Sequence, residues 1–324
     1  MTAGARRPRP LGVALAWHAH DFPALLRLVR RAEALGYAAA FVDGDASQMG
    51  GDPPRDVLDG WSVTLALLAG TERIAVGSIR LVHHWNAARL AQSVATASHL
   101  FGSRFRFFAS IGGHRIDRAF GLPFPGVGER VRWLDETLTA ARALWRGERV
   151  RMAGEFVHLD GAVVRPLPAG GAVPIAIAAR SPRLLELVAA HADVWDVNLP
   201  PIAERVGRAE RALAAACERR GRDPGAVARS QWIFTRVGRE GPGAAAVRAE
   251  FRRLNPWFAN VPDAELAEGL VAGPPDRCRS RIEEIREALG LSLPVVDLSG
   301  LSEAGAAAQL AALAPDQSSV DSGS

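Results

Sequence analysis

Lysine is absent from this 324-residue chain, so all 39 basic residues are arginine. We attribute this bias to the base composition of a GC-rich genome rather than to a demand of function. The arginines are spread along many predicted helices beside aspartate and glutamate, and the net charge is only +4. Nucleic-acid binding usually needs clustered basic side chains, so the composition argues against it, whereas a mildly basic protein suits an anionic small molecule.

Cysteine and long apolar runs are also scarce. Cys217 and Cys278 are the only cysteines, which argues against a disulfide-built scaffold and favours a reducing compartment, the cytoplasm. No apolar run approaches the roughly 20 residues that cross a bilayer. The apolar run 11–17 follows Arg6 and Arg7, but it is short and no small-residue cleavage site follows it. We therefore interpret it as a first strand rather than as part of a signal peptide.

The stretch 71–114 carries the clearest structural pattern. Residues 73–81 form a short apolar run rich in β-branched side chains, which predicts a buried strand. Apolar residues then recur at helical steps of four, three and four, at Leu90, Val94, Ala97 and Phe101. Gly102 ends this predicted helix, and residues 104–111 return to a strand pattern. Strand, helix and strand at this spacing predict a βαβ unit.

The same alternation continues along the chain. Strands are predicted at 11–17, 37–42, 73–81, 104–111, 173–178, 194–198, 231–237 and 293–298, with helices between them and a small hairpin excursion within 148–164. This predicts one α/β domain over 11–302, a (β/α)8 TIM barrel with loop insertions at its C-terminal face. Residues 1–10 are expected to be flexible, and 303–324 to form an Ala-rich end and a disordered tail. A doubly wound open sheet is the alternative, but no GxGxxG follows the first strand.

Candidate functional residues lie at the predicted strand ends, because the carboxyl ends of barrel strands gather on one face. They are Trp17, His18, His20, Asp43, Asp45, Ser78 to Asn86 with His83 and His84, Gly112, Gly113, His114, Ala179, Arg180, Ser181, Asp196, Asn198, Thr235, Asp297 and, less directly, His191. Some of the histidines are expected only to face solvent or to pack at strand ends. The segment 241–272 is long for a return helix and forms either a lid over the substrate or a plain surface excursion.

A metal site is one alternative. His18 and His20 form a His-x-His pair after the first strand, as in barrel metallohydrolases, and Asp297 could complete the set. The ends of the fifth and sixth strands offer Arg180 and Asp196 instead of histidine, so the neutral nitrogen ligands are missing. We therefore predict no metal.

Arg180-Ser181-Pro182 is a stronger signal. Ser181 is expected to be the N-cap of a helix that begins at Pro182, with Arg180 and Arg183 on either side. Helix N–H groups, the helix dipole and guanidinium together form a site for a phosphate. An ordinary capped helix would have the same Ser-Pro, so both interpretations stay open. Gly112-Gly113 permits close approach to a flat ligand, although a tight turn explains it equally well.

Several motifs, in the right order, resemble the bacterial-luciferase-like flavin and deazaflavin oxidoreductases over roughly residues 11–298. They are RIAVGSIRL, ARLAQSVATASHLFGSRFRFFASIGG, RAFGLPFPGVGERVRWLDETLTAARALWRGE, PIAIAARSPRLLELVAAHADVW and GPPDRCRSRIEEIREALGL. The resemblance implies a barrel in which a flavin or deazaflavin F420 lies at the strand C-termini.

What the resemblance implies can be carried over residue by residue. Ser78-Ile79 fall where the family often has a non-proline cis peptide that supports the ring. Gly112 and Gly113 match backbone that borders the cofactor. The segment Ala178, Ala179, Arg180 and Ser181 matches the contacts on the phosphate side. Arg130 lies near a typical arginine position of the family.

The chain also departs from the family pattern. Members often carry an Asp-His or Glu-His pair after the second strand, where this chain has Gly44 and Asp45. Deazaflavin sugar-phosphate dehydrogenases carry a glutamate acid where this chain has His114. The usual proline before the third helix is replaced around Asn86. The cofactor side is thus retained while the residues that handle protons have changed.

The resulting hypothesis is an oxidoreductase that exchanges a hydride between F420 and a small organic substrate, working in the cytoplasm as a homodimer without membrane or nucleic-acid partners. The pocket is expected to include Trp17, His18, Asp45, His84, His114 and Trp195. His114 or His84 would transfer the proton, since histidine titrates near neutral pH, and Asp45 would orient one of them. An FMN-dependent luciferase-like monooxygenase is the alternative, and a non-catalytic flavin-binding barrel is a third possibility.

Overall fold

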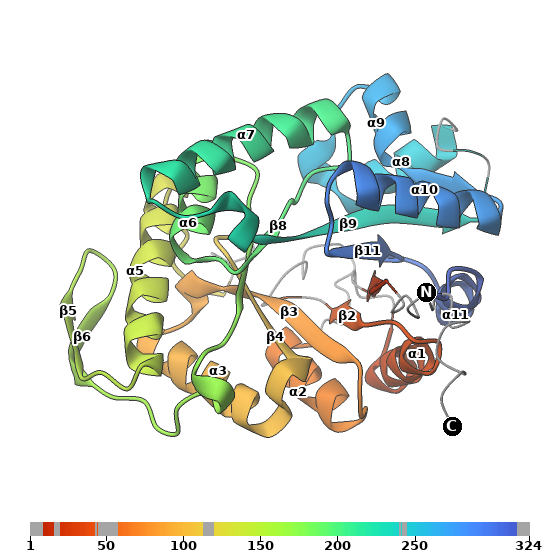
Figure 1. The fold of residues 1–324 in the computed structure, drawn as a ribbon. Coiled ribbons are helices and arrows are strands. Elements are labelled where there is room, and N and C mark those ends of the chain that lie inside the picture. Colours follow the sequence, from red (N-terminus) through yellow and green to blue (C-terminus); the bar gives the residue numbers. More distant parts are fainter. Residues whose placement is uncertain are drawn as a thin grey trace, which may run out of the picture.

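The computed structural model describes residues 9–15, 20–42, 44, 58–112, 120–239, 241 and 245–315. Eight parallel strands of this part of the chain form the barrel: β1 Gly12–Ala14, β2 Ala39–Val42, β3 Ala75–Leu81, β4 Phe105–Ser110, β7 Ile175–Ala178, β8 Val194–Asp196, β9 Ala228–Val237 and β11 Leu293–Asp297. They pair in that order, and β11 pairs with β1 to close the ring (Figure 1). The predicted TIM barrel is confirmed, and closure rules out the open sheet.

Helices surround the barrel. They are α1 Phe22–Ala34, α2 Gly60–Ala69, α3 Ala87–Phe101, α5 Val127–Trp145, α6 Pro182–His191, α7 Ala203–Arg219, α8 Ala245–Leu254, α9 Asp263–Gly269, α10 Pro275–Ala288 and α11 Glu303–Ala312. Four of them begin where a short polar side chain accepts a first-turn N–H, at Asp21, Asp59, Asn86 and Ser302. Within the described residues, no helix is long and apolar enough to cross a membrane.

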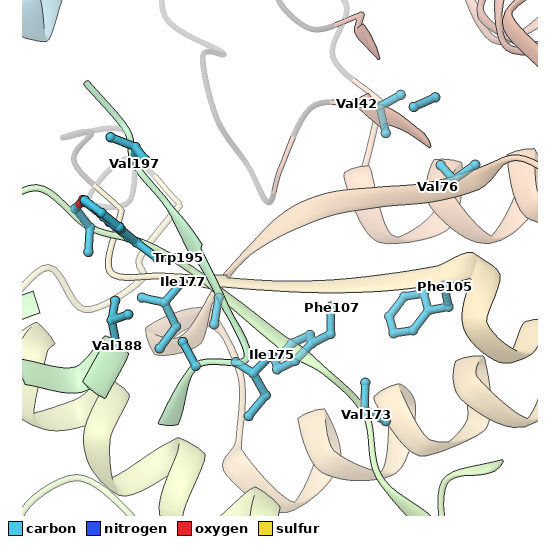
Figure 2. Packing of buried hydrophobic residues seen from close by; sticks show 14 of the residues in the cluster. Val42, Val76, Phe105, Phe107, Val173, Ile175, Ile177, Val188, Trp195 and Val197 are labelled. Carbon is cyan, nitrogen blue, oxygen red and sulfur yellow. The ribbon is translucent and has the colours of Figure 1, made fainter. Parts of the chain in front are cut away.

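Successive strand residues point alternately into the barrel and out towards the helices. The outward layer is the larger apolar cluster, and Figure 2 shows Ile177 and Trp195 within it, together with Val188 of α6. The inward cluster is smaller and is formed by Ala14, Ala39, Phe41, Ala75, Phe108, Ala178 and Val295. The barrel interior is therefore a packed core, and residues that can bind a ligand are expected at the C-terminal ends of the strands.

A hairpin stands outside the barrel beside α5, formed by β5 Val150–Ala153 and β6 His158–Ala162 (Figure 1). Its tip is held by Glu136 of α5, whose carboxylate accepts the backbone N–H groups of residues 155, 156 and 157. Phe156 at the tip stacks on Trp133 of α5 with ring centroids 5.1 Å apart. The predicted hairpin excursion is thus anchored along the first half of α5.

The segment that follows β9 is packed against the barrel. Its helices α8 and α9 bury an apolar cluster of their own, in which Phe251 contacts Phe234 of β9 and stacks on Phe258. The short strand β10 Val271–Gly273 then adds to the outer end of β9. The described part of 241–272 therefore forms a layer with its own apolar core, which packs on the β9 side of the barrel.

The Ala-rich end of the chain contributes α11, which packs against α1 (Figure 1). Tyr37 donates a hydrogen bond to the backbone oxygen of Leu310, and Arg27 of α1 pairs with Glu303. The helix that follows the last strand is therefore part of the barrel's outer ring.

Candidate functional site

The floor of the site is apolar and aromatic. Phe41 lies edge-on to Phe108 with centroids 6.4 Å apart, and Trp232 lies 6.1 Å from Phe41. All three rings project inward from different strands, and Ile79 and Ala178 pack beside them. A flat ring system bound above this floor would rest on apolar atoms.

Ser78 and Ile79 face opposite ways. Ile79 belongs to the inward cluster and is partly exposed. The hydroxyl of Ser78 instead lies 2.5 Å from that of Thr64 and donates to the backbone oxygen of Gly60, so it serves the contact between β3 and α2. Of this predicted pair, only Ile79 presents its side chain to the site.

The expected cis peptide between Ser78 and Ile79 is wrong. Among the described residues the cis bond is Arg165–Pro166. β3 keeps an unbroken parallel register with β4 through both residues, as far as Leu81 and Ser110. A regular ladder to the end of the strand leaves both peptides in the ordinary trans form.

Gly44 explains one departure from the family pattern. A Cβ built on this residue would lie 2.7 Å from the carbonyl oxygen of Ile79 and 3.2 Å from its Cβ. The backbone after β2 thus crosses directly against β3, and only glycine permits that approach. A side chain with acid–base function cannot stand at this position without displacing the strand beneath it.

Gly112 follows β4 and has a positive φ of 65°. A Cβ there would meet the ring of His83 and the side chain of Leu81, each at 3.2 Å. Both conformation and space therefore require glycine, and the backbone of this turn is uncovered on its other side, since Gly112 is partly exposed. This fits the predicted border of a flat ligand.

The start of α6 is the best-formed part of the predicted phosphate site. Ser181 occupies the N-cap position with extended backbone angles, but its hydroxyl makes no cap hydrogen bond. Ser181 is therefore the N-cap residue, as predicted, but its side chain does not make the hydrogen bond that a capping serine usually makes. First-turn N–H groups that a cap would occupy remain available to an anion.

Arg180 stands beside that helix start. Its guanidinium lies 5.1 Å from the ring centroid of Phe258, so the α8–α9 layer supports it from one side. Partial burial lowers the pKa of Arg180, although arginine stays protonated at any working pH. An arginine at the residue before an uncapped helix start is suited to a phosphate.

Ala178 and Ala179 differ in what they can offer. Ala178 lines the barrel interior. Ala179 is fully buried, its N–H donates to the backbone oxygen of Asp196, and its carbonyl accepts from Trp195 Nε1. Its groups are therefore used within the fold. Trp195 is fully buried in the helix-facing cluster, so the expectation that it lines the pocket is wrong.

His84 lines a pocket that lies away from the barrel floor. It belongs to the 3₁₀ helix Val82–His84, and its ring contacts that of His83 at 4.4 Å. The pocket has a volume of about 320 Å³ and lies among this helix, α5 and the hairpin tip, with the lining His83, His84, Trp85, Asn86, Ala87, Trp133, Phe156, Val157 and His158. The structure thus separates His84 from the inward-facing residues.

Several predicted residues are not placed. His18, Asp45, Gly113 and His114 lie outside the described residues, as does Trp17. His191 is described, but it ends α6 at the face opposite the strand C-termini, where its Nε2 lies 2.6 Å from Asp135 Oδ1. It is a structural partner of α5, and its pairing holds the pKa of Asp135 below its ordinary value. Within the described chain no group of three His, Cys, Asp or Glu side chains is arranged to hold a metal.

Two buried carboxyl groups were given no acid–base role by the sequence reasoning. Asp196 ends β8 and Asp297 ends β11, and both are about 5% exposed or less. Burial raises the pKa of Asp196 to about 7, against the hydrogen bonds from Ser230 and the Asn198 backbone. Burial also raises the pKa of Asp297, which Arg236 partly opposes. Their position at strand ends was visible in the sequence, but their burial was not.

A family model described as luciferase-like monooxygenase matches residues 8–292. Among curated proteins, the F420-dependent glucose-6-phosphate dehydrogenase of Nocardia farcinica is 31% identical over 164 residues, 46% of this chain and 48% of that protein. The F420-dependent hydroxymycolic acid dehydrogenase of Mycobacterium tuberculosis is 26% identical over 204 residues, 62% of this chain and 55% of that protein. The chain spans about a third to just over half of the curated relatives it matches.

Solved structures extend the likeness to the whole fold. An F420-dependent secondary alcohol dehydrogenase, solved with an F420–acetone adduct, has a TM-score of 0.76 and 18% identity, covering 94% of this chain and 99% of the other. An EDTA monooxygenase from Chelativorans sp. BNC1 has a TM-score of 0.76 and 14% identity, covering 94% and 93%. At this identity the likeness supports the fold alone.

Proposed function

The chain belongs to the luciferase-like monooxygenase family, and from this premise we propose that it is an oxidoreductase that binds deazaflavin F420. The observation that carries the proposal is the start of α6, where Arg180 stands beside a helix N-terminus that Ser181 does not cap. F420 is preferred to FMN because the curated relatives are named as F420-dependent dehydrogenases.

The described residues fit such a cofactor. Arg180 and the first turn of α6 would hold a phosphate. Gly112 would let the backbone approach the edge of the ring, and Ile79 and Ala178 would support its face. When bound, the deazaflavin supplies two-electron hydride chemistry, and the protein positions it and manages the accompanying proton. The predicted neighbours Gly113, His114, Asp45 and His18 belong to the same proposal.

We also infer that the protein works in the cytoplasm and as a homodimer on a small organic substrate. Cys217 and Cys278 are both buried free thiols, which suits a reducing compartment. Size-exclusion chromatography with light scattering tests the dimer, and a monomeric mass at micromolar concentration contradicts it.

Binding of F420 and of FMN, each followed by fluorescence quenching, tests the cofactor. We expect micromolar or tighter binding of F420 and weaker binding of FMN. Binding of neither would remove both enzymatic proposals and leave a barrel protein without this cofactor chemistry. Tighter FMN binding with oxygen consumption by the reduced complex would instead favour the monooxygenase, in line with the EDTA monooxygenase among the structural neighbours.

Arg180→Ala tests the phosphate assignment. A charge-assisted hydrogen bond contributes about 1.5–3 kcal/mol, so the Kd for F420 should rise roughly tenfold to a hundredfold. Arg89→Ala removes the same charge from the exposed start of α3, where the Arg89 guanidinium donates to its helix neighbour Gln92, and serves as the control. Equal Kd values for the two variants would defeat the assignment.

A further inference from the structure

Asp196 projects into the barrel on the same side as the candidate cofactor site. In β8 the flanking residues Trp195 and Val197 belong to the helix-facing cluster, so the residue between them faces inward. Its register partner on β7 is Ala178, a member of the inward cluster. Two residues beyond Ala178 along the chain stands Arg180. The carboxyl group therefore borders the wall from which the proposed phosphate and ring contacts arise.

Within the described part of the chain, hydrogen-bond donors contact the carboxyl group of Asp196. Ser230 Oγ of β9 donates to Asp196 Oδ2 at 3.0 Å, and the backbone N–H of Asn198 donates to the carboxyl group as well. Among the described residues of β7, β8 and β9 that surround it, none forms an ion pair with it. A buried carboxyl without a cation is stable mainly in its neutral form.

The turn beyond Asp196 is also unusual. Asn198 has a φ of 45°, and it is the one non-glycine residue with positive φ among the described residues. The same residue donates its backbone N–H to the carboxyl group of Asp196. Side chains with left-handed backbone cost free energy and persist where surrounding structure requires them.

We propose that Asp196 is the acid–base residue of this site and exchanges a proton with a substrate that carries a polarised C=O or conjugated C=C bond, or with the corresponding alcohol. The proposal rests on the proposed function, since the hydride is exchanged with the deazaflavin. The proposal also gives the site an acid–base residue on a different strand. The chain after β2 cannot supply one at Gly44, because there is no room for a side chain there.

The proton and electron pairs balance in both directions. In reduction, the electrophilic carbon of the substrate gains a hydride from reduced deazaflavin, which is thereby oxidised. The oxygen or carbon left with the electron pair takes the proton from the carboxyl group, and the carboxylate regains a proton from water. In oxidation, the carboxylate would accept the hydroxyl proton, and oxidised deazaflavin would take the hydride from the carbon that bears the hydroxyl group. A pKa of about 7 keeps both forms of Asp196 available at neutral pH.

The first test observes the carboxyl group itself. In protein labelled with ¹³C at aspartate Cγ, the signal that disappears in Asp196→Asn should titrate with a midpoint near 7. Addition of F420 should move that midpoint or the chemical shift, and the signal lost in Asp297→Asn serves as the comparison. A midpoint below about 5, or a signal unmoved by F420 that binds, would overturn the proposal. If neither F420 nor FMN binds, the proposed function fails first, and the proposal with it.

The second test measures turnover of reduced F420 with cyclohexanone and cyclohex-2-enone as probes. Asp196→Asn should lower kcat about 100-fold or more, with the Kd for F420 nearly unchanged. Ser230→Ala retains the acid but removes a bond to its charged form, so the pH limb of kcat should move upward by about half a unit. A purely structural role would leave that limb in place. An unmoved limb, or no turnover of either probe by the F420-bound protein, contradicts the assignment.

Discussion

Strands β8 and β11 both end in an aspartate that faces the barrel interior. In each, the carboxylate accepts the backbone N–H two residues further on, from Asn198 to Asp196 and from Ser299 to Asp297 Oδ1 at 2.9 Å. A hydroxyl also bonds each carboxyl group, from Ser230 and from Ser299 respectively. The two strand ends are thus built by the same local hydrogen-bonding pattern.

The residues that surround Asp297 differ from those that surround Asp196. At β11, the fully buried Arg236 donates to the backbone oxygens of Asp297 and Ser299 and pairs with Glu250 of α8 at 3.0 Å. At β8 none of the described residues forms an ion pair with Asp196, and the backbone oxygen of Asp196 accepts the N–H of Ala179. One strand end is therefore fixed by a charged network that ties it to α8, and the other holds a titratable group beside the candidate site. The comparison separates a structural aspartate from one available for chemistry.

Of the substitutions considered, Arg236→Met at the β11 end should lower the free energy of unfolding most. The methionine keeps apolar volume, but the carbonyl oxygens of Asp297 and Ser299 lose their donor and Glu250 loses its partner. Removing one member of a buried ion pair costs about 3–5 kcal/mol. We expect that loss in the free energy of unfolding, measured by urea denaturation.

Ser230→Ala is the matched change at β8, because it removes one hydrogen bond to a carboxyl group that is neutral below about pH 7. It should cost about 1 kcal/mol. Equal losses for the two variants would mean that the two strand ends do not differ in the way their neighbours indicate.

The pH dependence of stability tests whether Asp196 at the end of β8 is protonated in the folded protein. Asp196 keeps its proton in the folded protein up to about pH 7, whereas an unfolded chain releases it near the ordinary value of 3.8. Between these values the folded state holds more protons, so the contribution of this group to stability falls as pH rises. From pH 5 to pH 8 the loss should be about 2–3 kcal/mol.

Asp196→Asn removes that titration and provides the measurement. The free energy of unfolding of the variant, minus that of the wild type, should increase by the same amount across pH 5 to 8 in urea titrations at fixed ionic strength. A difference that is constant with pH would show that the carboxyl group is ionised in the folded protein throughout this range.

The sequence predicted the elements better than the directions of their side chains. The helix start at Pro182 follows local rules of capping and proline geometry, and it was found where predicted. Ser78 and Trp195 were assigned to the site, although neither side chain faces it. Parallel barrel strands are buried on both faces, so their apolar runs do not reveal which residues point inward. Register with neighbouring strands was needed for that.

The difference between Asp196 and Asp297 could not be predicted from the sequence either, because it depends on residues that are distant in the chain. The charged neighbour of Asp297 comes from β9, 61 positions away in the chain, and Glu250 comes from a helix whose packing depends on the whole α8–α9 layer. No pattern within a strand reports such a neighbour. The family resemblance, in contrast, rests on motifs that stay in order along the chain, and the family match confirms it.

The turns that follow the two aspartates provide a last test of the comparison, with the smallest expected effects at Asn198. Asparagine tolerates the left-handed backbone better than alanine does, so at φ 45° Asn198→Ala should destabilise the protein by about 1 kcal/mol, while Asn198→Gly should stay within about 0.5 kcal/mol of the wild type. The β11 end has Gly300 in the corresponding turn, with φ 80°, and a Cβ there would also meet Leu254 Cδ1 and Cδ2 at 3.0 Å. Gly300→Ala should therefore cost more than Asn198→Ala, because it adds a steric conflict with α8 to the backbone strain. Urea denaturation of the three variants measures the order, and a larger loss for Asn198→Ala would show that the β8 turn, and not the β11 turn, is the more tightly packed of the two.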